Sequence, residues 1–203
     1  KTLGMVFRAL GGDAGLRVQN AVSERHGARR SFLERVSGTG FKAGKASVDG
    51  ASLNLPERIA LFPDAGLNRD LYVWLAALAA HDVPNDEEWI VRNQRATVVA
   101  LDRFPGLQSR HDRLLAAVLA LRAGPGSLPS DEAAREQAVR DALQTPGSVT
   151  CLPLLTRKGA KALQPVPMWL YPSSGGTGTP RRLEHQEAAE GSKGTESESR
   201  HKA

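Results

Sequence analysis

The sequence predicts an α+β fold that is mainly α, with a small N-terminal unit containing a β-hairpin, a bundle of about four helices, and a disordered linker and tail. Asp49-Gly50 lies between two short stretches of extended character, and Asp-Gly is preferred chemistry for a tight hairpin turn. From Leu67 onward, apolar residues recur at helical spacing between Pro and Gly breaks. After residue 172, Ser, Gly and Thr and then charged residues dominate, a composition that does not build a core.

Residues 1–62 are predicted to form the small α+β unit. Apolar spacing over residues 2–10 predicts a helix, which Gly11 and Gly12 should end. Alternation of apolar and polar residues over 16–21 predicts a short strand. The two hairpin strands are predicted within 41–48 and 52–55.

Residues 63–171 are predicted to form the helical bundle and an irregular extension. Asp64 is the expected N-cap of its first helix. The apolar stripe of this helix consists of Leu67, Leu71, Trp74, Leu75 and Leu78. Such spacing places the five side chains on one face, which should pack on the core.

Three further helices are predicted in this domain. The second should begin with Asn85 as N-cap and Glu88 as its capping-box partner, and end near residue 103. The third is expected over 107–122, and the fourth over 131–143 with Ser130 as its cap.

The remaining residues are predicted to have no regular structure. The Pro-rich apolar stretch 146–171 is expected to lie over the surface of the bundle. Residues 172–203 are expected to be a flexible charged linker leading to a missing C-terminal domain, so the chain resembles an excerpt of a longer protein.

Composition excludes several classes of protein. The single cysteine, Cys151, cannot form an internal disulfide or a cysteine zinc site, which fits a reducing, cytoplasmic compartment. No apolar run reaches the roughly 18–20 residues that span a bilayer, and no signal peptide is recognised. We therefore expect no membrane partner.

The net charge of +5 is unevenly distributed. Residues 1–45 carry 9 Lys and Arg against 3 Asp and Glu, whereas the rest is near neutral. The predicted partner-binding residues are the concentrated basic ones, namely Arg25, Arg29, Arg30, Arg35, Lys42 and Lys45. Few aromatic residues accompany them, which argues against nucleic acid and favours an acidic protein surface or a solvated face.

Two enzyme interpretations remain as alternatives. His81-Asp82 and His111-Asp112 could belong to a helical metal phosphohydrolase, although a helix end and a polar helix face explain them more simply. A phosphate-binding loop at 38–46 would lack the hydroxyl that must follow Lys45. Neither pattern identifies a catalytic residue, a cofactor or a metal ligand.

Residues 55–80 form the most distinctive run of the sequence. A Phe-Pro turn leads into a helix whose polar start lies beside an apolar stripe. We expect Arg69 to pair with Asp70 or Glu57 and so to fix the junction between the two domains. The predicted junction residues are Phe62, Asp64, Asn68, Arg69, Asp70 and Trp74.

Three segments resemble the N-terminal region of the CbbO/NorD family of von Willebrand factor A-domain proteins. They are Phe7-Arg-Ala-Leu-Gly-Gly-Asp13, His26-Gly-Ala-Arg-Arg30 and Leu67-Asn-Arg-Asp-Leu-Tyr-Val-Trp-Leu75. Proteins of this family partner a hexameric MoxR-type AAA+ ATPase. They grip a client through a metal site of the C-terminal domain, whose Asp-x-Ser-x-Ser motif this chain lacks.

The resemblance implies a non-catalytic adaptor domain. The preferred interpretation is the N-terminal domain of a CbbO-type subunit, which docks onto a CbbQ-like ATPase so that inhibited Rubisco is remodelled. The alternative is a NorD-type activator of nitric oxide reductase. A phosphohydrolase and a nucleic-acid-binding module stay open as functions of other classes.

Overall fold

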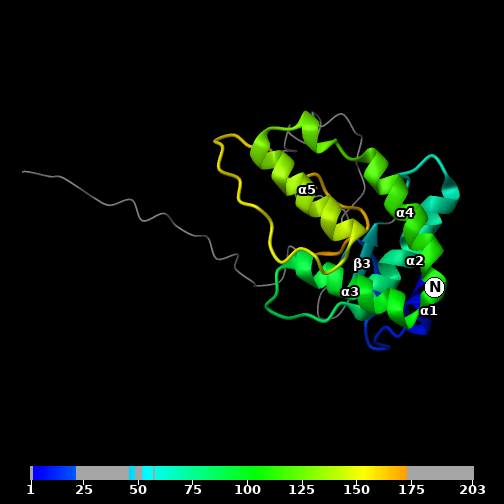
Figure 1. Cartoon of the computed structure of the whole chain (residues 1–203). Coiled ribbons are helices and arrows are strands. Elements are labelled where there is room, and N and C mark those ends of the chain that lie inside the picture. Colours follow the sequence, from blue (N-terminus) through cyan, green and yellow to red (C-terminus); the bar gives the residue numbers. More distant parts are fainter. Residues whose placement is uncertain (1, 22–45, 49–51, 57, 173–203) are drawn as a thin grey trace, which may run out of the picture.

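The computed structural model describes residues 2–21, 46–48, 52–56 and 58–172 (Figure 1). Five α-helices and a four-stranded sheet account for its regular structure within these ranges. The helices are α1 (Thr2–Ala9), α2 (Ala65–His81), α3 (Trp89–Arg103), α4 (Gln108–Leu121) and α5 (Ser130–Gln144). The strands are β1 (Arg17–Ala21), β2 (Ser47–Val48), β3 (Ser52–Pro56) and β4 (Tyr171–Pro172). The predicted class, α+β and mainly α, is confirmed.

Helix α1 ends where the two glycines predict. Gly11 has a φ of 88°, a conformation that residues with a Cβ rarely adopt. Gly12 donates its N–H to the Phe7 carbonyl at 2.9 Å, and a Cβ on Gly12 would lie 2.4 Å from the Phe7 ring. The close turn lets the ring, 1% exposed, enter the core.

The strands form one sheet in the order β1-β3-β2-β4. The predicted hairpin is present as the antiparallel pair of β2 and β3, with Val48 opposite Leu53. Strand β1 adds to β3 in parallel, and β4 adds to β2 in parallel. The sequence did not predict these two pairings, because parallel partners are joined by long connections without local turn chemistry.

Helix α2 is the centre of the helical layer. It packs on α1, α3 and α4, and α5 packs on α3 and α4. The predicted stripe residues Leu71, Trp74, Leu75 and Leu78 are all 2% exposed or less. The small residues Ala76 and Ala77 are also fully buried, so neighbouring elements can approach this helix from several sides.

Two of the predicted helix starts are wrong. Asn85 accepts a hydrogen bond from the Glu87 N–H at 3.2 Å and so closes a local turn, while α3 begins at Trp89 with Glu88 at the cap position. Helix α5 begins at Ser130 itself, after Pro129, and has no side-chain cap. In both places a short polar side chain can serve a turn as well as a cap.

Residues 146–172 do not simply lie over the bundle, as the sequence suggested. Val166, Met168, Trp169 and Leu170 are 4% exposed or less and belong to the main apolar cluster. That cluster also contains Phe7 and helix residues, so side chains from both predicted domains share one core. The domain boundaries themselves stay predictions.

Within the described ranges, none of the helices combines the length and apolar character needed to cross a bilayer. The turn at 49–50, the basic segment 25–45 and the tail 173–203 lie outside the described residues.

Candidate functional site

The predicted junction residues lie around the turn that precedes α2. The side-chain oxygen of Asn68 accepts the N–H groups of Leu61 and Phe62, each at 2.9 Å, and its amide donates to the Phe62 carbonyl at 2.7 Å. Asp64 caps the helix by accepting the Gly66 N–H at 2.6 Å, as predicted. The amide also donates to the Asp64 carbonyl at 3.1 Å, so one side chain satisfies four backbone groups, and Phe62 is buried beside it.

The expected pairing of Arg69 with Asp70 is wrong, and the alternative partner, Glu57, lies outside the described residues. Asp70 instead accepts hydrogen bonds from Arg110 and Arg113, both at 2.6 Å, and Arg69 is exposed. Burial tends to raise the pKa of Asp70, but the bonds from Arg113 and Arg110 outweigh it and lower the pKa below its ordinary value. The carboxylate therefore ties α2 to α4, which sequence spacing could not indicate. A junction role for these residues stays a prediction.

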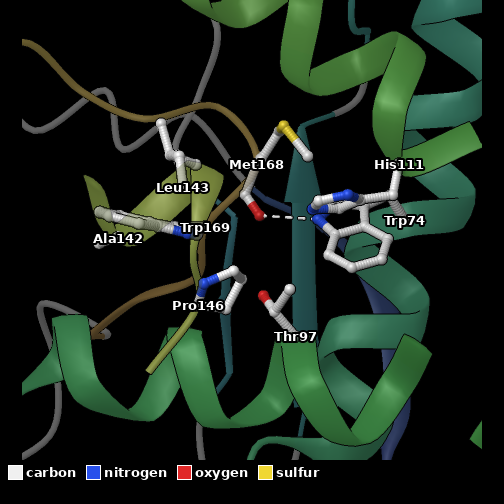
Figure 2. Close-up of a pocket in the computed structure, with 8 residues that line it drawn as sticks. All are labelled: Trp74, Thr97, His111, Ala142, Leu143, Pro146, Met168 and Trp169. Carbon is white, nitrogen blue, oxygen red and sulfur yellow. Dashed lines mark hydrogen bonds between the residues drawn. The ribbon is translucent and has the colours of Figure 1, made fainter. Parts of the chain in front are cut away.

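Trp74 joins three elements at the centre of the molecule. Its Nε1–H donates to the Met168 carbonyl at 3.0 Å, and its ring lies 4.7 Å from the His111 ring between centroids. Figure 2 shows both rings beside a small hollow between the helices and the returning segment. The hollow is too narrow for a water molecule and is lined by Trp74, Thr97, His111, Ala142, Leu143, Pro146, Met168 and Trp169.

His111 lies on a buried helix face, not on the polar face that the sequence suggested. It is 5% exposed, and its Nδ1 has no hydrogen-bond partner, with the Asp112 carboxylate 3.6 Å away. Burial lowers the pKa of His111, and Asp112 opposes that shift only in part. His111 is therefore a neutral ring packed against Trp74.

His81 has a similar environment at the end of α2. It is 8% exposed, lies 5.8 Å from the Phe104 ring between centroids, and its Nε2 has no hydrogen-bond partner. Burial, followed by the nearby Arg103, lowers its pKa. The described residues contain no group of three or more His, Cys, Asp or Glu side chains placed to hold a metal ion. The phosphohydrolase alternative therefore gains no support there.

Buried amide side chains of α3 hold the segment that follows α5. Asn93 forms two hydrogen bonds with the Leu170 backbone, from Nδ2 to the carbonyl at 2.9 Å and from the N–H to Oδ1 at 2.8 Å. Gln94 accepts the N–H groups of Gly147 and Val149 and donates to the Val149 carbonyl at 2.7 Å. These amides satisfy backbone N–H and carbonyl groups of an irregular segment, as a neighbouring strand satisfies those of a strand.

A buried ion pair holds the same segment further along. Arg122 and Glu136 are 5% and 3% exposed and form a two-bond contact of 2.8 and 2.7 Å. Arg122 also donates to the carbonyls of Gln164 and Pro165, both at 3.2 Å, and Arg140 donates to Glu136. The buried charges are thus paired and hydrogen-bonded, as buried charges must be.

The first turn of α5 provides a third attachment. Glu132 accepts the Lys161 N–H at 3.0 Å and is bonded by the Arg157 guanidinium, while Asp131 accepts the Arg157 N–H at 3.0 Å. This backbone bond, and then the other partners, lower the pKa of Asp131 although burial opposes the shift. We call residues 146–172, held by these side chains, the strap.

Sequence reasoning missed the side chains that hold the strap. Asn93 and Gln94 interrupt the apolar positions of α3, and a polar pair on a buried face requires partners from elsewhere. Arg122, two residues before the Gly124-Pro125 break, is likewise a polar residue that needs a partner once its helix end is buried. Cys151 is exposed on the strap. The predicted partner-binding residues, Arg25 to Lys45, lie outside the described residues, so their role stays a prediction.

Comparison with known proteins identifies relatives. The chain is 42% identical over 191 residues to an uncharacterized protein of Pseudomonas aeruginosa, and 39% identical over 191 residues to Protein NorD of Stutzerimonas stutzeri. Each overlap covers 94% of this chain and 30% of the relative. Protein NorD of Brucella abortus is 37% identical over 132 residues, covering 59% of this chain and 21% of that protein.

No family model and no solved structure matches the chain. The chain is therefore related to NorD proteins and spans less than a third of the length of these relatives, 30% or 21%. The names support the NorD alternative, and they lend nothing to the preferred sequence interpretation as a Rubisco activase subunit.

Proposed function

We propose that this chain, a relative of NorD proteins, is a non-catalytic docking part of a NorD-type protein that cooperates with a MoxR-type AAA+ ATPase to activate nitric oxide reductase. The observation that carries the proposal is the 39% identity to Protein NorD over 94% of the chain. By the family resemblance, ATP hydrolysis belongs to the partner, and the client is gripped by a domain outside this chain.

The architecture of the described residues is compatible with a docking role. Its buried polar side chains, such as Asn93, Gln94 and Arg122, bond to backbone groups of the strap. They fix the shape of a scaffold, and they do not converge on an empty pocket. The solvent-facing loops that such a scaffold holds are then available to other proteins.

A deletion and complementation experiment tests the proposal. Cells that lack the full-length protein should assemble nitric oxide reductase but reduce nitric oxide poorly, and the full-length gene should restore the rate. A full-length protein without residues 1–172 should fail to restore it and should no longer co-purify with the ATPase. Normal nitric oxide reduction in the deletion strain would contradict the proposal.

The Rubisco interpretation is discriminated by a second assay. Purified full-length protein and ATPase are incubated with ATP and sugar-phosphate-inhibited Rubisco, and carboxylation is followed. We expect no recovery of carboxylation. Recovery of carboxylation, without an effect on nitric oxide reduction in the deletion strain, would instead support the interpretation as a Rubisco activase subunit.

The basic segment offers a further test of docking. Charge reversal of Arg25, Arg29 and Arg30 to Glu should weaken ATPase binding most at low salt. At higher salt, screening already weakens the charge contacts, so the substitutions remove less binding energy there. A pull-down that is unchanged at low and at moderate salt would exclude this segment as a docking surface.

A further inference from the structure

The strap contains a loop that is held at both ends and has no buried residue between them. Gln94 bonds to Gly147 and Val149 at one end, and Arg122 bonds to Gln164 and Pro165 at the other. None of residues 150–165 is buried. In Figure 1 this stretch (yellow) leaves the helices after α5 and returns to the centre of the molecule (orange).

The middle of this loop runs straight with free backbone groups. Residues 152–156 contain no turn or bend, and Pro153 favours an extended conformation for itself and for Leu152. In the described part of the chain, no backbone hydrogen bond involves residues 150–156. Among the described residues, the hydrogen bonds that attach the loop between its two ends are those of Arg157 and Lys161 to Asp131 and Glu132. The loop therefore offers an extended backbone to another molecule.

Side chains alternate along this straight stretch. Pro153 and Leu155, the two chain neighbours of Leu154, are half-buried, whereas Leu154 is 83% exposed and is the most exposed large apolar residue described. Successive side chains of an extended chain point to opposite sides. Leu154 therefore points away from the body on a backbone that the scaffold holds in place.

Basic side chains follow the apolar stretch. Lys158 and Lys161 are exposed, and among the ion pairs of the described residues neither has a partner. Across residues 144–165 the chain has the basic residues Arg157, Lys158 and Lys161 and no acidic one. The complementary surface is a free strand edge with an apolar pocket for Leu154 and carboxylates beyond it.

We propose that the loop over residues 150–161 is a docking element for the AAA+ ATPase partner, separate from the basic segment 25–45, and that it adds its extended backbone to a strand edge of the ATPase and inserts Leu154 into a pocket there. This inference rests on the proposed function, which supplies the ATPase. The fixed ends keep the loop in its binding conformation, so little ordering entropy is lost on docking.

The test measures binding of the purified full-length protein to the purified ATPase by biolayer interferometry. Leu154→Asp should weaken binding at least tenfold, because a charge replaces the side chain that fills the pocket. Val83→Asp is the matched control, since Val83 is a 63% exposed apolar residue of the loop between α2 and α3. That control should bind like the unmodified protein. Equal urea midpoints for both variants exclude unfolding as the cause.

A cross-linking arm identifies the contact directly. A photoreactive benzoylphenylalanine placed at position 154 should cross-link to the ATPase on irradiation, and one placed at position 83 should not. Lys158→Glu should weaken binding several-fold at low salt and less at high salt.

The outcomes separate the two proposals. If the unmodified protein binds the ATPase and Leu154→Asp binds equally well, the loop is not the docking element, although the proposed function stands. If the unmodified protein does not bind, the ATPase partnership fails and this inference fails with it. Cross-linking from position 154 to a second copy of the same protein would overturn the inference and assign the loop to self-association.

Discussion

The two halves of the strap have similar composition and opposite environments. Both 150–156 and 164–171 are mainly apolar, contain proline and carry no helix. Leu154 is 83% exposed, whereas Val166 and Met168 are 0% and 1% exposed. Hydrophobicity alone therefore does not decide which half enters the core.

The difference lies in the hydrogen bonds available to the backbone. In the buried half, the Val166 N–H donates to the Tyr171 hydroxyl at 2.7 Å, Met168 accepts from Trp74, and Leu170 has both backbone groups bonded to Asn93. Burial of these groups without partners would cost a few kcal/mol each, of order 1–3. An irregular segment can enter a core only where neighbouring side chains satisfy its backbone.

The comparison is tested most strongly by truncating one apolar side chain in each half. Trp169→Ala removes a 2% exposed ring that lies 5.5 Å from the Trp89 ring between centroids, and should lower the free energy of unfolding by about 3–5 kcal/mol. Leu154→Ala should change it by less than about 0.5 kcal/mol. Urea denaturation of the chain measures both. Similar effects of the two substitutions would remove the distinction between the halves.

The second largest effect is expected at the ion pair of Arg122 and Glu136, which holds the start of the buried half. Glu136→Leu leaves the Arg122 guanidinium buried without a carboxylate, and should cost about 3 kcal/mol or more. Arg122→Met should cost a similar amount, because it leaves buried Glu136 with Arg140 as its remaining cation and frees two strap carbonyls. The double substitution should cost clearly less than the two single costs together, as a double-mutant cycle reveals. Simple additivity would mean that the pair is not coupled.

A moderate effect is expected from pH. The folded chain holds the pKa of His111 and of His81 below the ordinary value of about 6.5. Below about pH 6.5 the two histidines therefore take up protons more readily in the unfolded chain than in the folded chain. The free energy of unfolding should decrease as the pH is lowered, until the pH reaches the lowered pKa values of the folded chain. The slope is at most about 1.4 kcal/mol per pH unit for each histidine.

His111→Gln should remove one of these two contributions. Urea midpoints between pH 7.5 and 5 for this variant and the unmodified chain measure the difference in slope. The same slope in both would show that His111 does not titrate differently in the folded and unfolded chains. Because His111 packs on Trp74, which binds the buried half at Met168, acid should loosen that half first.

Local chemistry predicted much of the fold. The glycine stop of α1, the Asp64 cap and stripe of α2, and the hairpin of β2 and β3 are all found in the structure. Each depends on residues close together in the sequence, whose preferences are readable from spacing. The start of α3 failed because Asn85 bonds to Glu87 in a local turn, and that of α5 failed because Ser130 is already part of the helix, with Pro129 before it.

Long-range partners were not predictable in this way. Asp70 meets Arg110 and Arg113 some 40 residues later, with separations of 40 and 43, and Asn93 meets Leu170 at a separation of 77. No periodicity encodes such contacts. Polar residues on an apolar helix face indicated only that some partner exists, so the strap and the site that holds it came from the structure.

The smallest expected effect sharpens the comparison inside the exposed half itself. Leu152 packs on the core and Leu154 does not, although they are two residues apart on one straight stretch. Leu152→Asp should therefore lower the free energy of unfolding by about 1 kcal/mol, from the loss of partial burial, and Leu154→Asp by less than about 0.5 kcal/mol. Urea denaturation of the two variants at neutral pH measures the difference. If Leu154→Asp were the more costly change, the exposed leucine would be stabilising the fold, and its exposure would no longer support a role in binding a partner.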